Sequence, residues 1–194
     1  WLGYVSVGSQ TPLYRTKTPY FAGMIIFVLL AIIFEKYLIR NIDNNQWNTS
    51  LSRRTQHYGY LYDYRSRQAL IPTNAIPDWS TFVINRLVDK NIINFIPDQM
   101  IINEYKPGQG ISPHIDSVLS FENGIVSLSL GSPVVMEFTK DSSTIETILE
   151  RKSIIALHDD ARYKWKHSIP ARKSDNGVPR SRRLSLTFRK MKIN

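Results

Sequence analysis

The sequence contains no cysteine among its 194 residues. This absence excludes disulfide bonds, zinc sites built on thiolates and cysteine nucleophiles, and it gives no sign of an oxidising compartment. A transition metal in this chain must therefore be held by histidine and carboxylate side chains. Histidine is scarce as well, so the candidate ligands are few: His57, His114, His158 and His167.

A long hydrophobic run is also missing. The apolar block at residues 21–34 has 14 residues, whereas a helix that spans a bilayer needs about 20. Basic residues flank both sides of the block, so no charge asymmetry would orient it in a membrane. A buried segment and a membrane anchor both stay open. We expect residues 1–34 to be an irregular N-terminal segment, and residues 35–194 to form one domain of an intracellular monomer, in the cytoplasm or nucleus.

Acidic residues are nearly absent from the C-terminal end. Residues 162–194 hold eleven Lys or Arg and one acid, Asp175, so this segment accounts for the whole net charge of +9. Such a charge distribution favours a polyanionic partner, with nucleic acid first and an anionic membrane surface second. A basic tail that only keeps the protein soluble is the alternative.

The pattern of apolar residues predicts early helices and late strands. Helical spacing occurs at residues 35–42 and 79–88, while residues 66–78 have the composition of a loop. Alternating or buried runs predict strands at residues 100–105, 125–130, 134–138, 152–157 and 183–189. We therefore expect an α+β, mainly β fold: a double-stranded β-helix, or jelly roll, covered by N-terminal helices. A sandwich of short strands is the alternative.

Two ligand-type residues stand two apart in the extended segment that contains His114 and Asp116. Side chains two apart in a strand point the same way, so one metal could contact both. A third candidate, His167, lies far enough downstream for several barrel strands to bring the chain back to the end of the barrel that holds His114 and Asp116. His158 competes for this role, although His158-Asp159-Asp160 is typical of a polar turn. Two histidines and one carboxylate match the facial triad of non-haem Fe(II) oxygenases, and a hydrolytic zinc site would look similar.

The last predicted strand, residues 183–189, carries an arginine at each end. Period-two alternation places Arg183, Ser185, Thr187 and Arg189 on one face and apolar residues on the other. An inward-facing arginine needs an anionic partner, and a carboxylate provides one in bidentate geometry. A metal triad beside a site for a dicarboxylate predicts an oxygenase that uses 2-oxoglutarate.

Tyrosines recur at every second position from Tyr58 to Tyr64, with arginines on both sides. We expect one strand with these rings on a shared face. Aromatic rings can stack on bases and guanidinium groups can pair with phosphates, as a surface for single-stranded nucleic acid requires. The alternative is a strand that packs its tyrosines into the core.

His114-x-Asp116, Trp165-x-His167-x-Ile169-Pro170 and the segment from Arg183 to Arg189 together resemble the AlkB family of Fe(II)/2-oxoglutarate dioxygenases. The resemblance implies Fe(II), 2-oxoglutarate and O₂, with iron on the two histidines and Asp116. It also implies that Arg183 pairs with the distal carboxylate of 2-oxoglutarate, and that other residues help hold this cosubstrate: Asn103, Tyr105, Ser185 and Arg189. Some members carry Asn where Ser185 stands. The segment near the substrate base in this family is matched by Arg53, Arg54, Gln56, His57, Tyr58 and Tyr60.

Within the family, residues 105–117 and 125–132 are most similar to the branch that hydroxylates a modified wobble uridine in tRNA. Members of that branch also carry an RNA-recognition domain and a methyltransferase domain, and neither fits in this sequence. We therefore expect oxidative demethylation of N-alkylated bases in DNA or RNA, with wobble-uridine hydroxylation as the alternative. A binding module for nucleic acid that has lost turnover is the alternative of another class.

Overall fold

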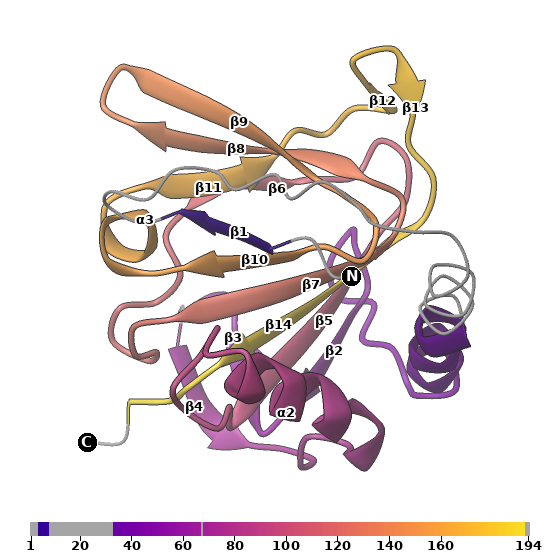
Figure 1. Ribbon diagram of the computed structural model, residues 1–194, viewed down its shortest axis with the longest axis vertical. Coiled ribbons are helices and arrows are strands. Elements are labelled where there is room, and N and C mark those ends of the chain that lie inside the picture. The colour runs from indigo at the N-terminus through magenta and orange to yellow at the C-terminus, as the bar shows by residue number, and fades with distance from the viewer. Residues whose placement is uncertain (1–3, 8–32, 67, 193–194) are drawn as a thin grey trace, which may run out of the picture.

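The computed structural model describes residues 4–7, 33–66 and 68–192, and two facing β-sheets make up most of this part (Figure 1). The larger sheet has the strand order β1-β10-β7-β14-β5-β2. The smaller has the order β6-β11-β8-β9. The strands of the larger sheet are β1 (Tyr4–Val7), β2 (Thr55–Tyr58), β5 (Gln99–Tyr105), β7 (Ile125–Gly131), β10 (Ile154–Leu157) and β14 (Arg183–Arg189). Those of the smaller sheet are β6 (Ile111–His114), β8 (Val134–Lys140), β9 (Ser143–Leu149) and β11 (Lys166–Ile169).

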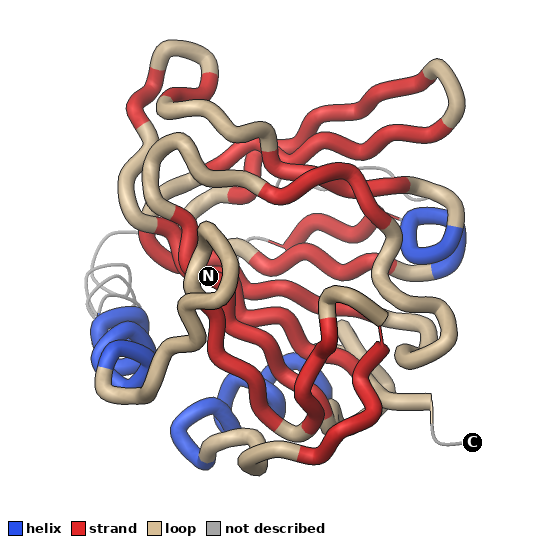
Figure 2. The backbone as a smooth tube through the Cα atoms, turned by 180° about the vertical axis from the view of Figure 1, so that it is seen from behind, coloured by secondary structure: helices blue, strands red, loops and turns tan. Residues whose placement is uncertain are grey.

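Two hairpins and short helices complete the described chain. The hairpins are β3 (Tyr60–Asp63) with β4 (Gln68–Pro72), and β12 (Ser174–Asp175) with β13 (Val178–Pro179). The helical elements are residues 33–43, η1 (Asp78–Ser80), α2 (Thr81–Asp89) and α3 (Asp159–Tyr163). Figure 2 shows the helices at the periphery, outside the strands. The predicted jelly-roll core with covering helices is confirmed, and so are the helices expected near residues 35–42 and 79–88.

Strand β14 of the larger sheet separates a hydrophobic core from a cavity. In β14, Leu184, Leu186 and Phe188 pack beneath the helices together with Leu38 and Leu87. The alternate residues of this strand line a cavity on the other face, between the sheets. This is the period-two pattern of a strand buried on both sides. The predicted division of residues 183–189 into an apolar and a polar face is therefore confirmed, and it sends the arginines into the barrel.

The helix at residues 33–43 is fixed to the larger sheet by a buried carboxylate. Glu35 is 2% exposed; its carboxylate accepts hydrogen bonds from the Gly131 amide at 2.9 Å and from the Arg151 guanidinium at 2.7 Å. Of the apolar block at residues 21–34, only residues 33–34 are described, and they are helical; the rest lies outside the described residues. Within the described ranges, every helix is too short or too polar to cross a bilayer.

Three local expectations are wrong. Residues 4–7, expected to be irregular, form β1, which pairs in parallel with β10. Residues 68–72, expected in a loop, form β4. The tyrosine-rich stretch is not one strand: β2 stays in the larger sheet, whereas β3 leaves it to pair with β4. The break lies at Gly59, whose φ of +78° is a left-handed conformation that favours glycine.

Replacing Gly59 by Ala is expected to destabilise the protein strongly. A Cβ at this position would lie 1.8 Å from the Asp98 carbonyl oxygen. Gly177 is the matched control, because it has a similar φ of +81° and nothing within 4 Å of its Cβ position. The left-handed conformation alone costs about 1–2 kcal/mol, and forced overlap adds about 1–3 kcal/mol. Urea unfolding should therefore show a larger loss for Gly59→Ala than for Gly177→Ala, and equal losses would contradict the expected clash.

Candidate active site

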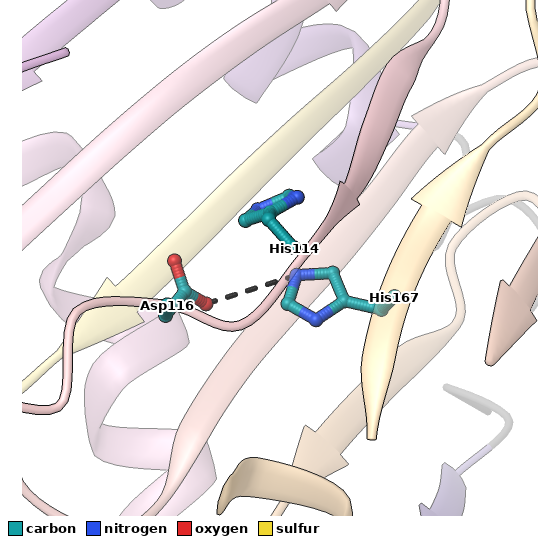
Figure 3. Close-up of side chains that lie close together, drawn as sticks. All are labelled: His114, Asp116 and His167. Atoms are coloured by element: carbon teal, nitrogen blue, oxygen red, sulfur yellow. Dashed lines mark ion pairs between the residues drawn. The ribbon is translucent and has the colours of Figure 1, made fainter. Parts of the chain in front are cut away.

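The three predicted metal ligands converge in space (Figure 3). β6 and β11 are antiparallel neighbours, and their register places His114 opposite His167. The two imidazole centroids are 4.4 Å apart. Asp116 follows β6 by two residues and turns its carboxylate toward them, so that one ligand atom from each side chain lies within 4.8 Å of the others. Two nitrogens and one carboxylate oxygen on one side of a metal form the donor set that suits non-haem Fe(II).

The hydrogen bond of His114 and the burial of His167 both suit metal binding. His114 Nδ1 lies 2.8 Å from the Ser112 carbonyl oxygen. Because a carbonyl can only accept, Nδ1 carries the proton and Nε2 is left for a metal. Burial, the largest effect, lowers the pKa of His167 to about 4, although the nearby Asp116 carboxylate opposes this shift. The His167 imidazole can therefore offer a lone pair near neutral pH.

Asp116 is kept ionised by its surroundings. Burial, the largest single effect, raises the pKa of this carboxyl, but nearby positive charge, above all that of the Arg189 guanidinium, outweighs burial and lowers the pKa. Arg189 donates from Nη2 to Asp116 Oδ1 at 3.0 Å and from Nη1 to Gln99 Oε1 at 3.1 Å. Arg189 therefore orients the carboxylate ligand, in addition to lining the cavity beside it.

Arg183 is a buried cation whose hydrogen-bonding capacity is mostly unused. It is 2% exposed, and burial lowers its pKa to about 10, so it stays charged at neutral pH. Nη2 donates to Ser129 Oγ at 2.7 Å. Within the described part of the chain, Nε and Nη1 have no partner. Buried donors are rarely left unpaired. An anion in this cavity would satisfy them, and a carboxylate has the geometry to do so.

The other residues predicted to hold the cosubstrate line the same cavity as Arg183 and the metal ligands. The Tyr105 ring lies 5.3 Å from the Arg183 guanidinium carbon. Ser185 Oγ is 2.7 Å from Ser127 Oγ. The cavity thus combines a cationic end, hydroxyl and amide groups, and the metal ligands, and these features fit a dicarboxylate that also contacts the metal. The members of this set are Asn103, Tyr105, Arg183, Ser185 and Arg189.

The residues expected near a substrate base separate into two groups. Arg53 and His57 lie on the site side of β2: Arg53 Nε donates to Asn103 Oδ1 at 3.1 Å, and its guanidinium carbon is 5.6 Å from the Tyr64 ring. His57 Nδ1 accepts from the Tyr62 amide at 3.2 Å. Tyr60 belongs to the hairpin and packs against a small cluster that includes Phe121. Arginine and tyrosine side chains thus gather beside the cavity.

The remaining three residues have structural partners elsewhere. Gln56 is 3% exposed and donates from Nε2 to the Ile42 carbonyl at 2.8 Å. The buried Tyr58 hydroxyl donates to Gln56 Oε1. Arg54 pairs with both oxygens of Glu104 at 2.6 and 2.8 Å. The structure does not bring Arg54, Gln56 or Tyr58 together with the metal ligands: alternation along β2 turns Gln56 and Tyr58 away from the cavity, and Arg54, which precedes β2, pairs with Glu104.

Most basic side chains of the C-terminal segment, residues 162–194, are buried or half-buried in the fold. Of its eleven Lys and Arg, only the lysines at 164, 166, 173 and 192 are exposed. Arg180 binds Asp175, and Arg182 binds Asp43 and Glu104. Arg162 is 2% exposed and donates to main-chain carbonyls. Net charge alone does not show which basic side chains are buried. The sequence therefore did not identify Arg162 as a residue of the site.

The stability of the protein is expected to fall in acid through His57. Burial, followed by the charges of Arg189 and Arg53, lowers the pKa of His57 to about 4. Between pH 6.5 and 4 the unfolded chain binds a proton that the folded chain does not bind, so the free energy of unfolding decreases as the pH falls. The expected loss between pH 7 and 4.5 is on the order of 2 kcal/mol.

His57→Asn is the comparison variant for this prediction. Asn can accept from the Tyr62 amide, as His57 Nδ1 does, but it does not titrate. Denaturant unfolding at both pH values should show a smaller loss in the variant than in the wild type. An equal loss would mean that other groups, such as His167, account for the acid sensitivity.

Comparisons with known proteins agree with this geometry. The model of the 2OG-Fe(II) oxygenase superfamily matches residues 36–189. A protein of Acanthamoeba polyphaga mimivirus is 42% identical over 163 residues, covering 80% of this chain and 78% of that protein. The tRNA (carboxymethyluridine(34)-5-O)-methyltransferase alkbh8 of Xenopus tropicalis is 35% identical over 153 residues, covering 73% of this chain and 24% of that protein. The alkylated DNA repair protein ALKBH8 homolog of Arabidopsis thaliana is 33% identical over 189 residues, covering 81% and 55%.

A solved structure shows the same fold. OsALKBH1 superposes with a TM-score of 0.61 at 18% identity, over 81% of this chain and 89% of that chain. Fold and site together define a dioxygenase that depends on Fe(II) and 2-oxoglutarate. The chain belongs to the 2OG-Fe(II) oxygenase superfamily and, within it, to the AlkB family. It spans about a quarter of the frog relative and about half of the Arabidopsis relative.

Proposed function

We propose that this chain oxidises alkyl groups on the bases of DNA or RNA, and that its main reaction is demethylation of N-alkylated bases. The observation that carries the proposal is one cavity that is lined by the three metal ligands and by Arg183, whose Nε and Nη1 have no hydrogen-bond partner among the described residues. A zinc hydrolase would have no use for this buried cation. An inactive binding module would have no reason to keep both features.

Bound Fe(II), with 2-oxoglutarate and O₂, supplies hydroxylation of a C–H bond while 2-oxoglutarate is converted to succinate and CO₂. The chain's own residues hold and orient these reactants. His114, Asp116 and His167 would hold the metal. Arg183 would receive the distal carboxylate of 2-oxoglutarate, and Arg189 keeps Asp116 ionised and would orient it as a metal ligand. A hydroxylated N-methyl group leaves as formaldehyde and restores the base.

Nucleic acid is the substrate class that suits the side chains beside the cavity. Arg53 offers a cation for a phosphate, and Tyr62 and Tyr64 offer rings on which a base can stack. A single-stranded or flipped base would bring its alkyl group to the metal. The reaction would then take place in the cytoplasm or nucleus, with the chain as a monomer.

The name of the Arabidopsis relative, an alkylated DNA repair protein, supports demethylation. Hydroxylation of a modified wobble uridine in tRNA is the second candidate, favoured by the 35% identity to the frog tRNA-modifying protein.

Mass spectrometry can decide between these reactions. Single-stranded DNA and RNA oligonucleotides with defined N-methylated bases, and tRNA with modified wobble uridines, are incubated with the protein, Fe(II), ascorbate and 2-oxoglutarate. Loss of a methylene's mass from a base indicates demethylation, and gain of an oxygen's mass indicates hydroxylation. Succinate release without any change in the nucleic acids would contradict the proposed substrate class while leaving the oxygenase intact.

A further inference from the structure

One buried arginine holds the loop that presents a metal ligand. Arg162 lies in α3 and is 2% exposed. Its Nη1 donates to the carbonyl of Asp116 at 2.9 Å. Its Nη2 donates to the carbonyls of Ser117 at 3.0 Å and Phe121 at 3.3 Å, and its Nε donates to that of Glu122 at 3.4 Å. One guanidinium therefore ties together both ends of the loop at residues 116–122.

This arrangement is costly for a cation. Across residues 4–7, 33–66 and 68–192, Arg162 forms no ion pair with a carboxylate, and burial lowers its pKa although the charge of Asp116 opposes this shift. Removing a charge from water costs several kcal/mol. The compensation comes from the geometry of arginine, whose five N–H donors in a rigid plane can satisfy several carbonyls at fixed spacing. A lysine carries the same charge, but its single ammonium cannot hold four carbonyls in that arrangement.

The far end of the same loop supports the β3–β4 hairpin. Ser120 Oγ accepts a hydrogen bond from the Ala69 amide at 3.2 Å. The Phe121 ring stacks on Tyr62, with centroids 6.1 Å apart and an interplanar angle of 25°. The loop thus joins a metal ligand at one end to the tyrosine-bearing hairpin at the other.

We propose that Arg162 is a positioning residue that fixes residues 116–122, so that Asp116 presents its carboxylate to the metal and the β3–β4 hairpin stays docked beside the cavity. This inference depends on the metal site of the proposed function, but not on the choice of nucleic acid. It follows that metal affinity and the order of the hairpin change together when Arg162 is replaced.

Two replacements, Arg162→Gln and Arg162→Lys, test the inference in the metal-free full chain. Co(II) binding is followed by its absorption spectrum, and amide hydrogen exchange is measured for residues 116–122 and 60–72. Loss of a group that orients a ligand costs about 10- to 100-fold in metal affinity. We expect a rise of this size in the Co(II) dissociation constant for Arg162→Gln, with faster exchange in both segments. Arg162→Lys should show the same changes to a smaller extent.

Arg180→Gln is the matched control, because Arg180 is also a buried arginine but binds Asp175 and the Pro170 carbonyl instead. It should leave Co(II) affinity and exchange in both segments unchanged. Wild-type Co(II) affinity in a folded Arg162 variant would overturn the inference, and so would weakened Co(II) binding with unchanged exchange in the hairpin. If Arg162→Gln does not fold, Arg162→Lys decides on the same criteria. Normal Co(II) binding by the wild type without oxidation of any oligonucleotide would count against the proposed function alone.

Discussion

Asp116→Asn is expected to abolish metal binding and 2-oxoglutarate turnover without unfolding the protein. The asparagine amide oxygen can still accept the hydrogen bond that Arg189 Nη2 now gives to Asp116 Oδ1 at 3.0 Å. It lacks the negative charge that Fe(II) requires from its third ligand. Changes outside the ligand set cost about 10- to 100-fold in metal affinity, so the loss of a ligand should cost more than about 100-fold. Co(II) titration and succinate formation with Fe(II) measure the two effects.

Asn is a sharper choice here than Ala. Asp116→Ala would also leave the buried Arg189 without its acceptor, and breaking a buried pair costs about 3–5 kcal/mol. Lys192→Ala is the surface control, because Lys192 is exposed and its ammonium donates to the Val118 carbonyl. It should keep full turnover and lose only salt-sensitive binding to nucleic acid. Retained succinate formation in a folded Asp116→Asn protein would refute the assignment of the metal ligands.

The parts of the fold that could be predicted are those where neighbouring residues determine the structure. The alternation from Arg183 to Arg189 predicts both the strand and the face that each side chain occupies, because a strand buried on both sides has two different cores. The β9 strand could not be predicted in this way. Most of its residues are exposed, so no hydrophobic period marks it.

The parts of the site that could be predicted are those whose chemistry is rare. His114, Asp116 and His167 stand out because the chain has four histidines and no cysteine. Arg162 does not, because its role depends on carbonyl groups some 40 residues away in the sequence.

The clustered positive charge near the C-terminus predicts a surface for polyanions. In the folded chain, however, several of these side chains form ion pairs, such as Arg182 with Glu104. The sequence shows how many charged side chains there are, whereas the ion pairs of the folded structure determine which of them stay available to a partner.

The tyrosine stretch shows the same limit at a single residue. Tyr58 and Tyr60 have the spacing of one strand face, but the left-handed conformation at Gly59 sends them to different sheets. A glycine in a strand pattern can mark either a bulge or a change of direction. Contact with Asp98, 39 residues away, settles the outcome here.

Arg183→Gln is expected to remove the stabilisation of the protein by 2-oxoglutarate. In the absence of this cosubstrate, the variant should be as stable as the wild type or more stable. Without an anion, Arg183 is a buried charge with two donor nitrogens, Nε and Nη1, that have no hydrogen-bond partner among the described residues. Replacing such a charge by a neutral group relieves its desolvation. With 2-oxoglutarate bound, the variant lacks hydrogen bonds to a carboxylate, each of which contributes about 1.5–3 kcal/mol. The Michaelis constant for 2-oxoglutarate should therefore rise by about 100-fold or more.

Arg182→Gln should give the opposite result and is therefore the decisive comparison. Arg182 precedes Arg183 in the chain, but its guanidinium pairs with Asp43 and Glu104, which links the end of the helix at residues 33–43 to the larger sheet. Its replacement should lower the melting temperature and leave the effect of 2-oxoglutarate intact. Thermal unfolding with Mn(II), with and without 2-oxoglutarate, measures both quantities, because a ligand that binds only the folded state raises the melting temperature. If 2-oxoglutarate still stabilises Arg183→Gln as much as the wild type, the cosubstrate does not bind at this guanidinium.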